Sequence, residues 1–570
     1  MKLKNKNILR LFISYLIILG LAYLLSLKFL RFDLTSEKRY TLSKYTENIL
    51  RNLSDKIYIK VYLAGKGLPV TLKKYQRDIK EELDEFKVYA GNNLDYEFID
   101  PSESKDREVR FGLYKTLSEK GLLPVETSEV SDDGKTSTKM VFPGALISYK
   151  GKEIAVNLLK NTAGTAPESE ENVNNSLQSL EYELTNAIQK LSRDKKPEIA
   201  FIEGHGELNE YQLMDISSVL SEYYTVKTGK IGGKPGILDN FKAVIIAKPM
   251  QKFSEKDKFV IDQYIMKGGN VMFLIDGTDT NIDSLFISSY TMALPLDLNL
   301  DDMLFQYGIR VNKDLLLDKF SSPIGITVQG PDGKPYIKNY PWYYFPVIVS
   351  DNKHVISKYL NYIKTEFVST LDTVGADKNL KKTVLLGSSE YTKNDPIPAR
   401  ISLEQVNHMP SDNLMRGGRK NLAVLTEGRF TSVFKNRPIE KYFPNLRYSD
   451  VITESKPAKI IAVSDGDIIR NEVSPDGKPY PLGFDRFTRH LFKGNKEFIL
   501  NAVNYLCDDG GLMTIRSREL KMRLLNHEKV KNNRFFIQSV NVVLPVLSVI
   551  IFGLAVYFVR KKRYTRGFKN

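Results

Sequence analysis

Residues 243–276, AVIIAKPMQKFSEKDKFVIDQYIMKGGNVMFLID, contain the pattern that decides the fold class. The stretch opens on the apolar segment AVIIA, which is typical of a strand buried on both faces. Ser254 and Asp257 then form a capping-box-like start for a helix. Gly268-Gly269 ends that helix just before a second apolar segment, NVMFLI. Strand, helix and strand in this order predict a β-α-β unit of an α/β domain.

The same alternation continues on both sides of this stretch. Other apolar segments that predict strands lie at 198–202, 383–386, 423–425 and 459–463. Buried strands separated by helical patterns predict a mostly parallel sheet with both faces covered. We therefore expect a larger α/β domain over residues 195–510. Residues from about 288 to 377 break the alternation, and we interpret them as an insertion.

A smaller α/β domain is predicted over residues 44–160. An alternating strand at 56–63 is followed by apolar residues at helical spacing and by a second strand at 94–99. Two further strands around Lys150-Gly151 predict a hairpin. This layout is thioredoxin-like, but the chain has a single cysteine, so dithiol redox chemistry is excluded.

Residues 161–194 connect the two domains. Their first part, NTAGTAPESEENVNN, is polar and is interpreted as a linker. Their second part predicts a helix with one apolar face, formed by Leu177, Leu180, Leu184, Ile188 and Leu191.

Two long apolar runs flank the soluble part of the chain. One lies within residues 8–30 and the other within residues 535–559. Each is long enough to cross a bilayer core as a helix, which takes roughly 20 apolar residues. The tails beyond them, residues 1–7 and 560–570, are basic and contain no acidic residue, so both are expected in the cytoplasm. The large domains are then expected outside the cytoplasm.

The charge of the chain follows the same pattern. The net charge of +15 is concentrated in the two tails and in residues 511–534, next to the second run. A basic excess beside a membrane does not indicate nucleic acid, and we expect no nucleic-acid partner. Residues 511–534 are either a solvated helix or a helix that rests on anionic headgroups.

The motif Gly204-His205-Gly206-Glu207 directly follows the strand IAFIE. The carboxyl end of a parallel strand is where α/β proteins bind ligands. A histidine beside a glutamate there could act as a base or bind a metal ion. Alternatively, the glycines allow a tight turn and His205 hydrogen-bonds within the loop. We favour this structural role because no second histidine lies nearby in the sequence.

Other candidate catalytic residues are isolated. Asp276 and Asp279 follow another strand and could take a cation with loop oxygens, although capping and turn roles are commoner. The segment DGKT at 133–136 resembles the end of a phosphate-binding loop, but Glu129 replaces the required glycine, so a hairpin turn is expected. No G-x-S-x-G elbow occurs, and Cys507 ends an apolar helix and is expected to pack.

Two places are candidate partner contacts. Residues 340–346, YPWYYFP, contain the only tryptophan, Trp342, which would either form a recognition surface or pack onto its own domain. In the second apolar run, Asn541, Pro545 and Ser548 share one helical face. Pro545 frees a backbone carbonyl and Asn541 is polar at membrane depth, so this face is expected to contact a protein neighbour.

Several stretches resemble membrane-anchored ABC-transporter auxiliary proteins. They are RFDLTSEKRYTLS, PEIAFIEGHGEL, residues 245–276, PWYYFP, NKEFILNAVNYLCDDGGL and RSRELKMRLL. With the two apolar runs, their order is most similar to the gliding-motility-associated members, which are often labelled substrate-binding components. The resemblance implies a separate ABC permease subunit, a separate ABC ATPase subunit and a role in bacterial gliding. It also implies a two-pass protein of the bacterial inner membrane with its large domain in the periplasm. The larger domain would be similar to class I glutamine-amidotransferase-like folds without the nucleophilic cysteine.

Three functions are open at this point. The first is a non-catalytic extracytoplasmic subunit of an ABC complex, without cofactor, metal ion or catalytic residue. The second is a membrane-tethered solute-binding receptor, which needs a cleft between the two α/β domains. The third is an extracytoplasmic hydrolase or metalloenzyme, which needs His205, Glu207, Asp276 and Asp279 to converge. We favour the first, because the chain has two membrane anchors and no assembled catalytic set.

Overall fold

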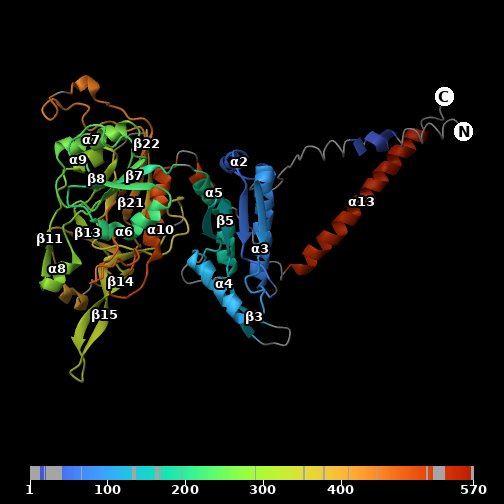
Figure 1. Cartoon of the computed structure of the whole chain (residues 1–570), viewed down its shortest axis with the longest axis horizontal. Coiled ribbons are helices and arrows are strands. Elements are labelled where there is room, and N and C mark those ends of the chain that lie inside the picture. The colour runs from blue at the N-terminus through green and yellow to red at the C-terminus, as the bar shows by residue number, and fades with distance from the viewer. Residues whose placement is uncertain are drawn as a thin grey trace. The chain divides into compact units, whose positions relative to one another are not determined.

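The structure is a computed structural model of the whole chain (Figure 1). It describes residues 13–17, 19–20, 41–65, 67–130, 136–160, 166, 168–193, 195–288, 290–350, 353–375, 379–408, 410–444, 446–474, 476–508, 511–517 and 533–565. Helices alternate with strands through much of this part, so the predicted mixed α/β class is confirmed. The chain divides into the units Met1–Arg518 and Glu519–Asn570, which are described separately.

The first unit starts with a four-stranded sheet in the order β2-β1-β5-β6. Its strands are β1 (Ile57–Val61), β2 (Leu94–Phe98), β5 (Gly144–Tyr149) and β6 (Lys152–Asn157). β1 pairs parallel with β2 across helix α3 (Val70–Ala90) and antiparallel with β5. Lys150 and Gly151 form the β5–β6 turn with φ of 48° and 75°, as a tight hairpin requires. These elements lie where the sequence predicts them, and the thioredoxin-like likeness stays a prediction.

Between β2 and β5 lie a helix that the sequence analysis missed and a second hairpin. The helix is α4 (Arg107–Glu119), and the hairpin pairs β3 (Val125–Val130) with β4 (Thr136–Val141). Val130 pairs with Thr136, and residues 131–135 between them lie outside the described residues. The hairpin expected at DGKT is therefore confirmed.

Helix α5 (Glu170–Ser192) follows the small sheet and serves two cores. Ser169 caps it by accepting a hydrogen bond from the N–H of Asn172. The helix therefore starts inside the segment that we interpreted as linker, because a serine cap followed by two glutamates is a favourable helix start. Leu184 packs in the core of the small sheet, whereas Tyr182 packs in a core of the larger one.

The larger sheet has nine strands within the described residues, and one half of it is parallel. This half consists of β8 (Thr225–Lys230), β7 (Glu198–Glu203), β9 (Ala243–Ala247), β10 (Asn270–Leu274) and β22 (Ala458–Val463). α6 (Glu210–Ser221) and α10 (Lys493–Leu506) cover one face, and α7 (Glu255–Met266) covers the other. Only β8 was not predicted, because this edge strand is polar and mostly exposed.

The other half of the sheet is antiparallel, so the expectation of a mostly parallel sheet is wrong there. β21 (Asn421–Gly428) runs antiparallel to β22, β18 (Leu380–Gly387) and β17 (Leu371–Thr373), and β12 (Ile309–Val311) pairs with β17. The physical reason lies in the connections. In the described residues between β18 and β22 only 3-10 helices occur, so the α-helix that usually makes a parallel crossover is lacking.

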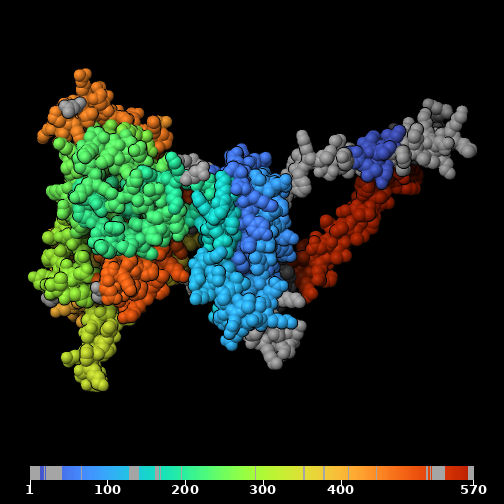
Figure 2. All heavy atoms as spheres, in the orientation of Figure 1, coloured from blue at the N-terminus to red at the C-terminus, as the bar shows by residue number. Residues whose placement is uncertain are grey.

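Apart from β12 and β17, the strands of the stretch that breaks the alternation lie in small sheets, two of which take a partner strand from beyond the stretch. Its elements and their partners are α8 (Ile282–Ile287), β11 (Tyr290–Ala293), α9 (Asp301–Gln306), β13 (Asp314–Asp318), β14 (Ser321–Gln329), β15 (Pro335–Ile348), β16 (Ile363–Lys364), β19 (Thr392–Pro396) and β20 (Ala399–Ser402). The tip of the β14–β15 hairpin projects from the larger domain (Figure 1) and forms a lobe on its surface (Figure 2). At the hairpin's base, Trp342 is fully buried beside Tyr344 in an aromatic core. Trp342 therefore packs within its own domain in this structure.

The C-terminal part holds the candidate membrane helix. α10 ends at Cys507, which packs in a core of the larger sheet, and the short α11 (Leu512–Ser517) follows. The second unit contains α13 (Arg534–Thr565). Its segment Arg534–Lys562 is 29 residues long and contains an 18-residue window with a mean hydropathy of 2.7, so by length and composition it could cross a membrane. Most of the run expected to span at 8–30 lies outside the described residues.

Candidate functional site

Four parallel strands of the larger sheet, β7, β9, β10 and β22, end at the same edge. Each buried strand is followed at once by polar residues. These are the GHGE loop after β7, Lys248 after β9, Asp276 after β10 and Asp465 after β22. In open α/β sheets, ligands bind at this edge. The edge is therefore the candidate functional site of the domain.

His205 is buried at this edge, and both of its ring nitrogens have partners. Nδ1 lies 3.0 Å from Oε1 of Glu207, and Nε2 lies 3.2 Å from Oδ2 of Asp257. The ring stacks on Phe253 with 3.7 Å between centroids. Burial lowers the pKa of His205, but the two carboxylates outweigh it, and the pKa is raised above its ordinary value. Neither ring nitrogen is left for a substrate or a metal ion in this arrangement.

The glycines of the GHGE loop allow its close approach to the loop after β9. Gly204 and Gly206 have φ of +116° and +75°, which L side chains rarely adopt. A Cβ on Gly206 would lie 3.2 Å from Cβ of Met250. The N–H groups of Met250 and Gln251 donate to the His205 carbonyl at 2.8 and 2.7 Å. These hydrogen bonds therefore hold the loop after β7 against the loop after β9.

A buried lysine joins the ends of three strands. The ammonium group of Lys248 lies 2.9 Å from Oδ2 of Asp276 and also pairs with Asp467. Oδ1 of Asp276 accepts a hydrogen bond of 2.5 Å from the N–H of Gly466. The side chains of Lys248, Asp276 and Asp467 are 9%, 7% and 8% exposed, so these ion pairs form in the protein interior.

The charges of this cluster depend on one another. Burial opposes the charge of Lys248, but Asp276 and Asp467 outweigh it and hold the pKa of Lys248 above its ordinary value. Burial raises the pKa of Asp465 well above its usual range, and the charges of Asp467 and Asp276 add to the rise. Oδ2 of Asp465 also accepts a hydrogen bond of 2.9 Å from the backbone N–H of Glu366.

The network continues through Arg470 to a second buried lysine. Nε of Arg470 lies 3.0 Å from Oδ1 of Asp467, and a terminal nitrogen lies 3.4 Å from Oε2 of Glu366. Nζ of Lys364 lies 2.8 Å from Oε1 of Glu366 and 3.0 Å from Oδ1 of Asp485. Burial raises the pKa of Glu366, but the charges of Lys364 and Arg470 outweigh it and lower the pKa to about 2. The charged side chains at this edge thus neutralise one another.

The structure brings only some of the predicted site residues together. Asp276 is part of the Lys248 cluster, whereas Oδ1 of Asp279 accepts a hydrogen bond of 2.9 Å from the N–H of Leu294, 15 positions further along the chain. Among the hydrogen bonds and ion pairs of the described residues, none joins His205 or Glu207 to either aspartate. The same residues contain no group of three or more His, Cys, Asp or Glu that could hold a metal ion.

Sequence reasoning missed most of the Lys248 cluster. A signal existed for Lys248, Asp465 and Asp467, because each stands just after an apolar strand that ends at the candidate edge. No sequence signal marked Lys364 and Asp485, which meet across 121 positions of the chain. Only the folded chain brings such groups together.

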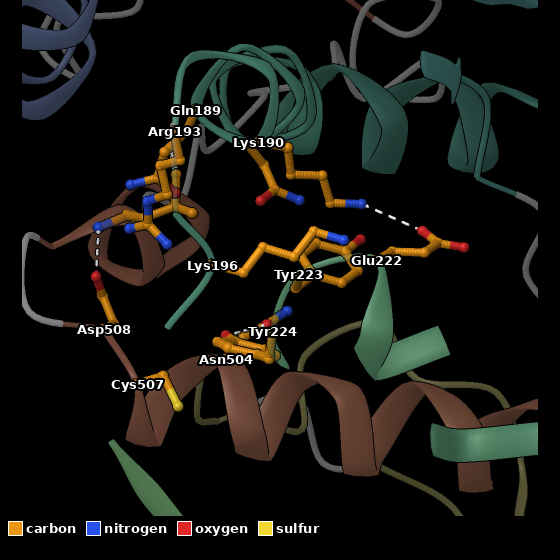
Figure 3. A pocket seen from close by; sticks show the side chains of 12 residues that line it. Gln189, Lys190, Arg193, Lys196, Glu222, Tyr223, Tyr224, Asn504, Cys507 and Asp508 are labelled. Carbon is orange, nitrogen blue, oxygen red and sulfur yellow. Dashed lines mark hydrogen bonds and ion pairs between the residues drawn. The ribbon is translucent and has the colours of Figure 1, made fainter. Parts of the chain in front are cut away.

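Two hollows lie in the described part of the first unit. One of about 40 Å³ lies beside the end of α5 (Figure 3), and a wider one of about 700 Å³ opens at α9 and β12. The smaller has room for a few water molecules. In it Lys190 pairs with Glu222, and Lys196 donates to the Ser221 carbonyl. In the wider one, charged lining residues are also paired, Asp302 with Lys258 and Arg437, Arg310 with Asp372, and Lys313 with Asp301. The charged residues named in both hollows therefore already have partners within the chain.

Comparison with known proteins assigns the class. Residues 196–502, which include the whole candidate edge, match the model of a family described as an ABC-type uncharacterized transport system. This match covers more than half of the chain. The chain belongs to this family, and it is an auxiliary component of an ABC transport system.

Other comparisons extend the likeness without adding a function. Residues 36–148 match a domain of unknown function (DUF7088). An uncharacterized protein of Borreliella burgdorferi is 22% identical over 581 residues, which cover 99% of this chain and all of that protein. A solved structure, the mmIFT52 N-terminal domain, is similar over 54% of this chain and 97% of its own, with 14% identity and a TM-score of 0.31. A TM-score this low does not establish a common fold.

The Lys248→Met substitution should strongly destabilise the larger domain. It leaves the buried Asp276 and Asp467 without their shared cation, which costs about 3–5 kcal/mol. Lys252→Met is the matched control, because Lys252 pairs with Asp297 on the surface. Loss of an exposed ion pair lowers the free energy of unfolding by less than about 1 kcal/mol. Urea unfolding followed by fluorescence of the buried Trp342 measures both. Equal losses for the two variants would show that the buried cluster is not held by Lys248.

The contribution of His205 to stability should depend on pH. Its pKa is raised in the folded state, so the charged ring between Glu207 and Asp257 stabilises the fold below the unfolded pKa of about 6.5. This contribution is lost as the pH rises through the folded pKa. The difference in free energy of unfolding between wild type and His205→Gln should therefore shrink from pH 5.5 upward, over about 3 pH units. His408→Gln is the control, because His408 is exposed. A difference that grows with pH would contradict the assignment.

Proposed function

We propose that this protein is a non-catalytic, membrane-anchored extracytoplasmic subunit of an ABC complex that serves bacterial gliding motility. It works with a separate permease and a separate ATPase. The proposal is carried by one observation, the presence in one chain of the transport-system family domain at 196–502 and of the apolar helix α13. The gliding role rests on the resemblance of the sequence to the motility-associated members.

The lack of catalysis is supported by the way in which the candidate edge is filled. A catalytic acid, base or nucleophile must be able to reach a substrate atom. At this edge both ring nitrogens of His205 face carboxylates, and Lys248 is held by Asp276 and Asp467 in the interior. These groups stabilise the ends of strands, and a substrate would have to displace their partners.

The proposed location is the bacterial inner membrane, with two spans and the large domains in the periplasm. α13 supplies one span, and the apolar run at 8–30 supplies the other. Basic tails at 1–7 and 560–570 favour cytoplasmic termini.

One face of α13 is proposed to contact the permease. Pro545 lacks an N–H, so the carbonyl of Asn541, four residues earlier, loses its helical partner. The Asn541 side chain adds a second polar group at the same level. Ser548 donates to the Leu544 carbonyl at 2.8 Å, so its small side chain is satisfied within the helix and permits close packing. A protein neighbour can bond the free groups of Asn541, whereas lipid cannot.

The topology can be tested by cysteine labelling in a Cys507→Ala background. Asn240→Cys lies on the exposed surface of the larger domain and should react with a membrane-impermeant thiol reagent on intact cells. Asn5→Cys and Asn570→Cys, in the tails, should react only after the cells are lysed. Labelling of the tails on intact cells, with Asn240→Cys protected, would reverse the proposed orientation.

Co-purification tests the partner face. The double variant Asn541→Leu, Ser548→Leu should lose most of the permease that co-purifies in mild detergent, because the polar face then becomes equivalent to lipid-facing leucine. The control is Val543→Leu, Ile550→Leu, which adds two leucines to the opposite face and should retain the permease. Both variants should be present in the membrane at wild-type amounts. Full co-purification from the first variant would place the contact elsewhere.

A further inference from the structure

The first described helix after the predicted N-terminal span, α2 (Lys44–Arg51), docks on α5 through buried polar groups. The carboxylate of Glu181 on α5 accepts hydrogen bonds of 2.7 Å from the N–H of Ser43 and from the hydroxyl of Thr46. The hydroxyls of Thr46 and Thr185 lie 3.0 Å apart, and Thr46 is fully buried. Buried hydrogen bonds to a charged group fix a geometry more firmly than apolar contact does.

The last described helix before the second span, α11, packs against the same helix α5. Asp508 starts α11 by accepting the N–H groups of Gly511, Leu512 and Met513 at 3.0, 3.1 and 2.9 Å. Leu512, Met513 and Ile515 are buried in a core of the larger sheet. This short helix is therefore held by its cap and by its apolar side chains.

The two docking sites meet at the C-terminal end of α5. Gln189 donates a hydrogen bond to the hydroxyl of Tyr45, which belongs to α2. Burial raises the pKa of Tyr45, the charge of Arg193 opposes this rise, and the charge of Asp508 adds to it. The Tyr45 hydroxyl therefore lies within electrostatic range of the residue that caps α11. Figure 3 shows Gln189, Arg193 and Asp508 gathered at this end of α5, with Arg193 and Asp508 pointing toward one another.

We propose that the C-terminal half of α5, with α2 and α11, forms a junction that couples the two chain segments leading to the membrane. A displacement of α11 is then transmitted to α2 through α5, and the reverse displacement is transmitted equally well. α5 is suited to this role because both faces are anchored, Leu184 and Ile188 in the core of the small sheet and Tyr182 in the core of the large one. Close-packed interiors transmit displacement rather than absorb it.

The role of this coupling in the cell rests on the proposed function, because it needs the two membrane spans. In the molecule itself, it requires that α2 and α11 share stability through α5. Coupling between two sites is reciprocal, so loosening either helix must loosen the other. This reciprocity separates a junction from two helices that happen to dock on one neighbour.

Hydrogen exchange of the purified full-length protein in detergent tests the inference. Asp508→Ala removes the cap of α11 and should speed exchange about fivefold both in residues 511–517 and in residues 44–51. Ser254→Ala is the matched control, because it removes the cap of α7 and should leave residues 44–51 unchanged. If Asp508→Ala does not fold, Asp508→Asn removes the charge and keeps one acceptor oxygen.

The reverse arm uses Thr46→Val, which removes the bonds to Glu181 and Thr185 and keeps the shape of the side chain. It should speed exchange in residues 511–517 by a similar factor, whereas Thr116→Val on α4 should not. If each variant loosens only its own helix, the junction is overturned. The measurement needs no permease and no living cell. A failure here therefore leaves the labelling and co-purification results standing, and a failure of those results does not affect this test.

Discussion

The first unit depends on a constraint that falls on one helix, α5, whose side chains belong to two cores at once. Leu184 and Leu191 are buried with the small sheet, and Tyr182 is buried with the large one. A helix in this position has little surface left for charged side chains, and its buried polar residues must find partners. Thr185 does so by facing Thr46. Because close-packed interiors resist relative motion, the two α/β domains are held together through this helix as parts of one unit.

A second constraint acts at the edge where the parallel strands end. Each apolar strand delivers a polar or charged residue to the same place, and a buried charge without a partner is expensive. Here the cost is offset by pairing between separate segments of the chain, Lys248 with Asp276 and Lys364 with Asp485. Such pairs add little net stability compared with an apolar core, but removing one partner is costly. They therefore fix which loops lie side by side.

The limits of the sequence reasoning follow from the same physics. β7, β9, β10 and β22 were predictable because strands buried on both faces are continuous apolar runs. The direction of β21 was not predictable, because periodicity does not encode strand direction. The start of α5 was missed because its first turns, although partly buried, are polar in sequence. At the site, the histidine loop and Asp276 could be identified, but their partners could not. Asp257, on helix α7, contacts His205 in the loop after β7 and lies 52 positions further along the chain.

In the proposed role, a non-catalytic subunit acts on its partners through contact and conformation. A conformational change has an effect only if a ligand or partner interacts differently with two arrangements of the protein. Among the described residues, the buried charges at the candidate edge are paired, and α5 packs in the cores of both α/β domains. The described helices next to the two predicted spans, α2 and α11, both pack on α5. In the proposed complex, a movement of the permease against α13 would reach the α/β domains through the chain segments that contain α2 and α11. In the proposed complex, an ABC partner would therefore act on this protein mainly by shifting the position of α5.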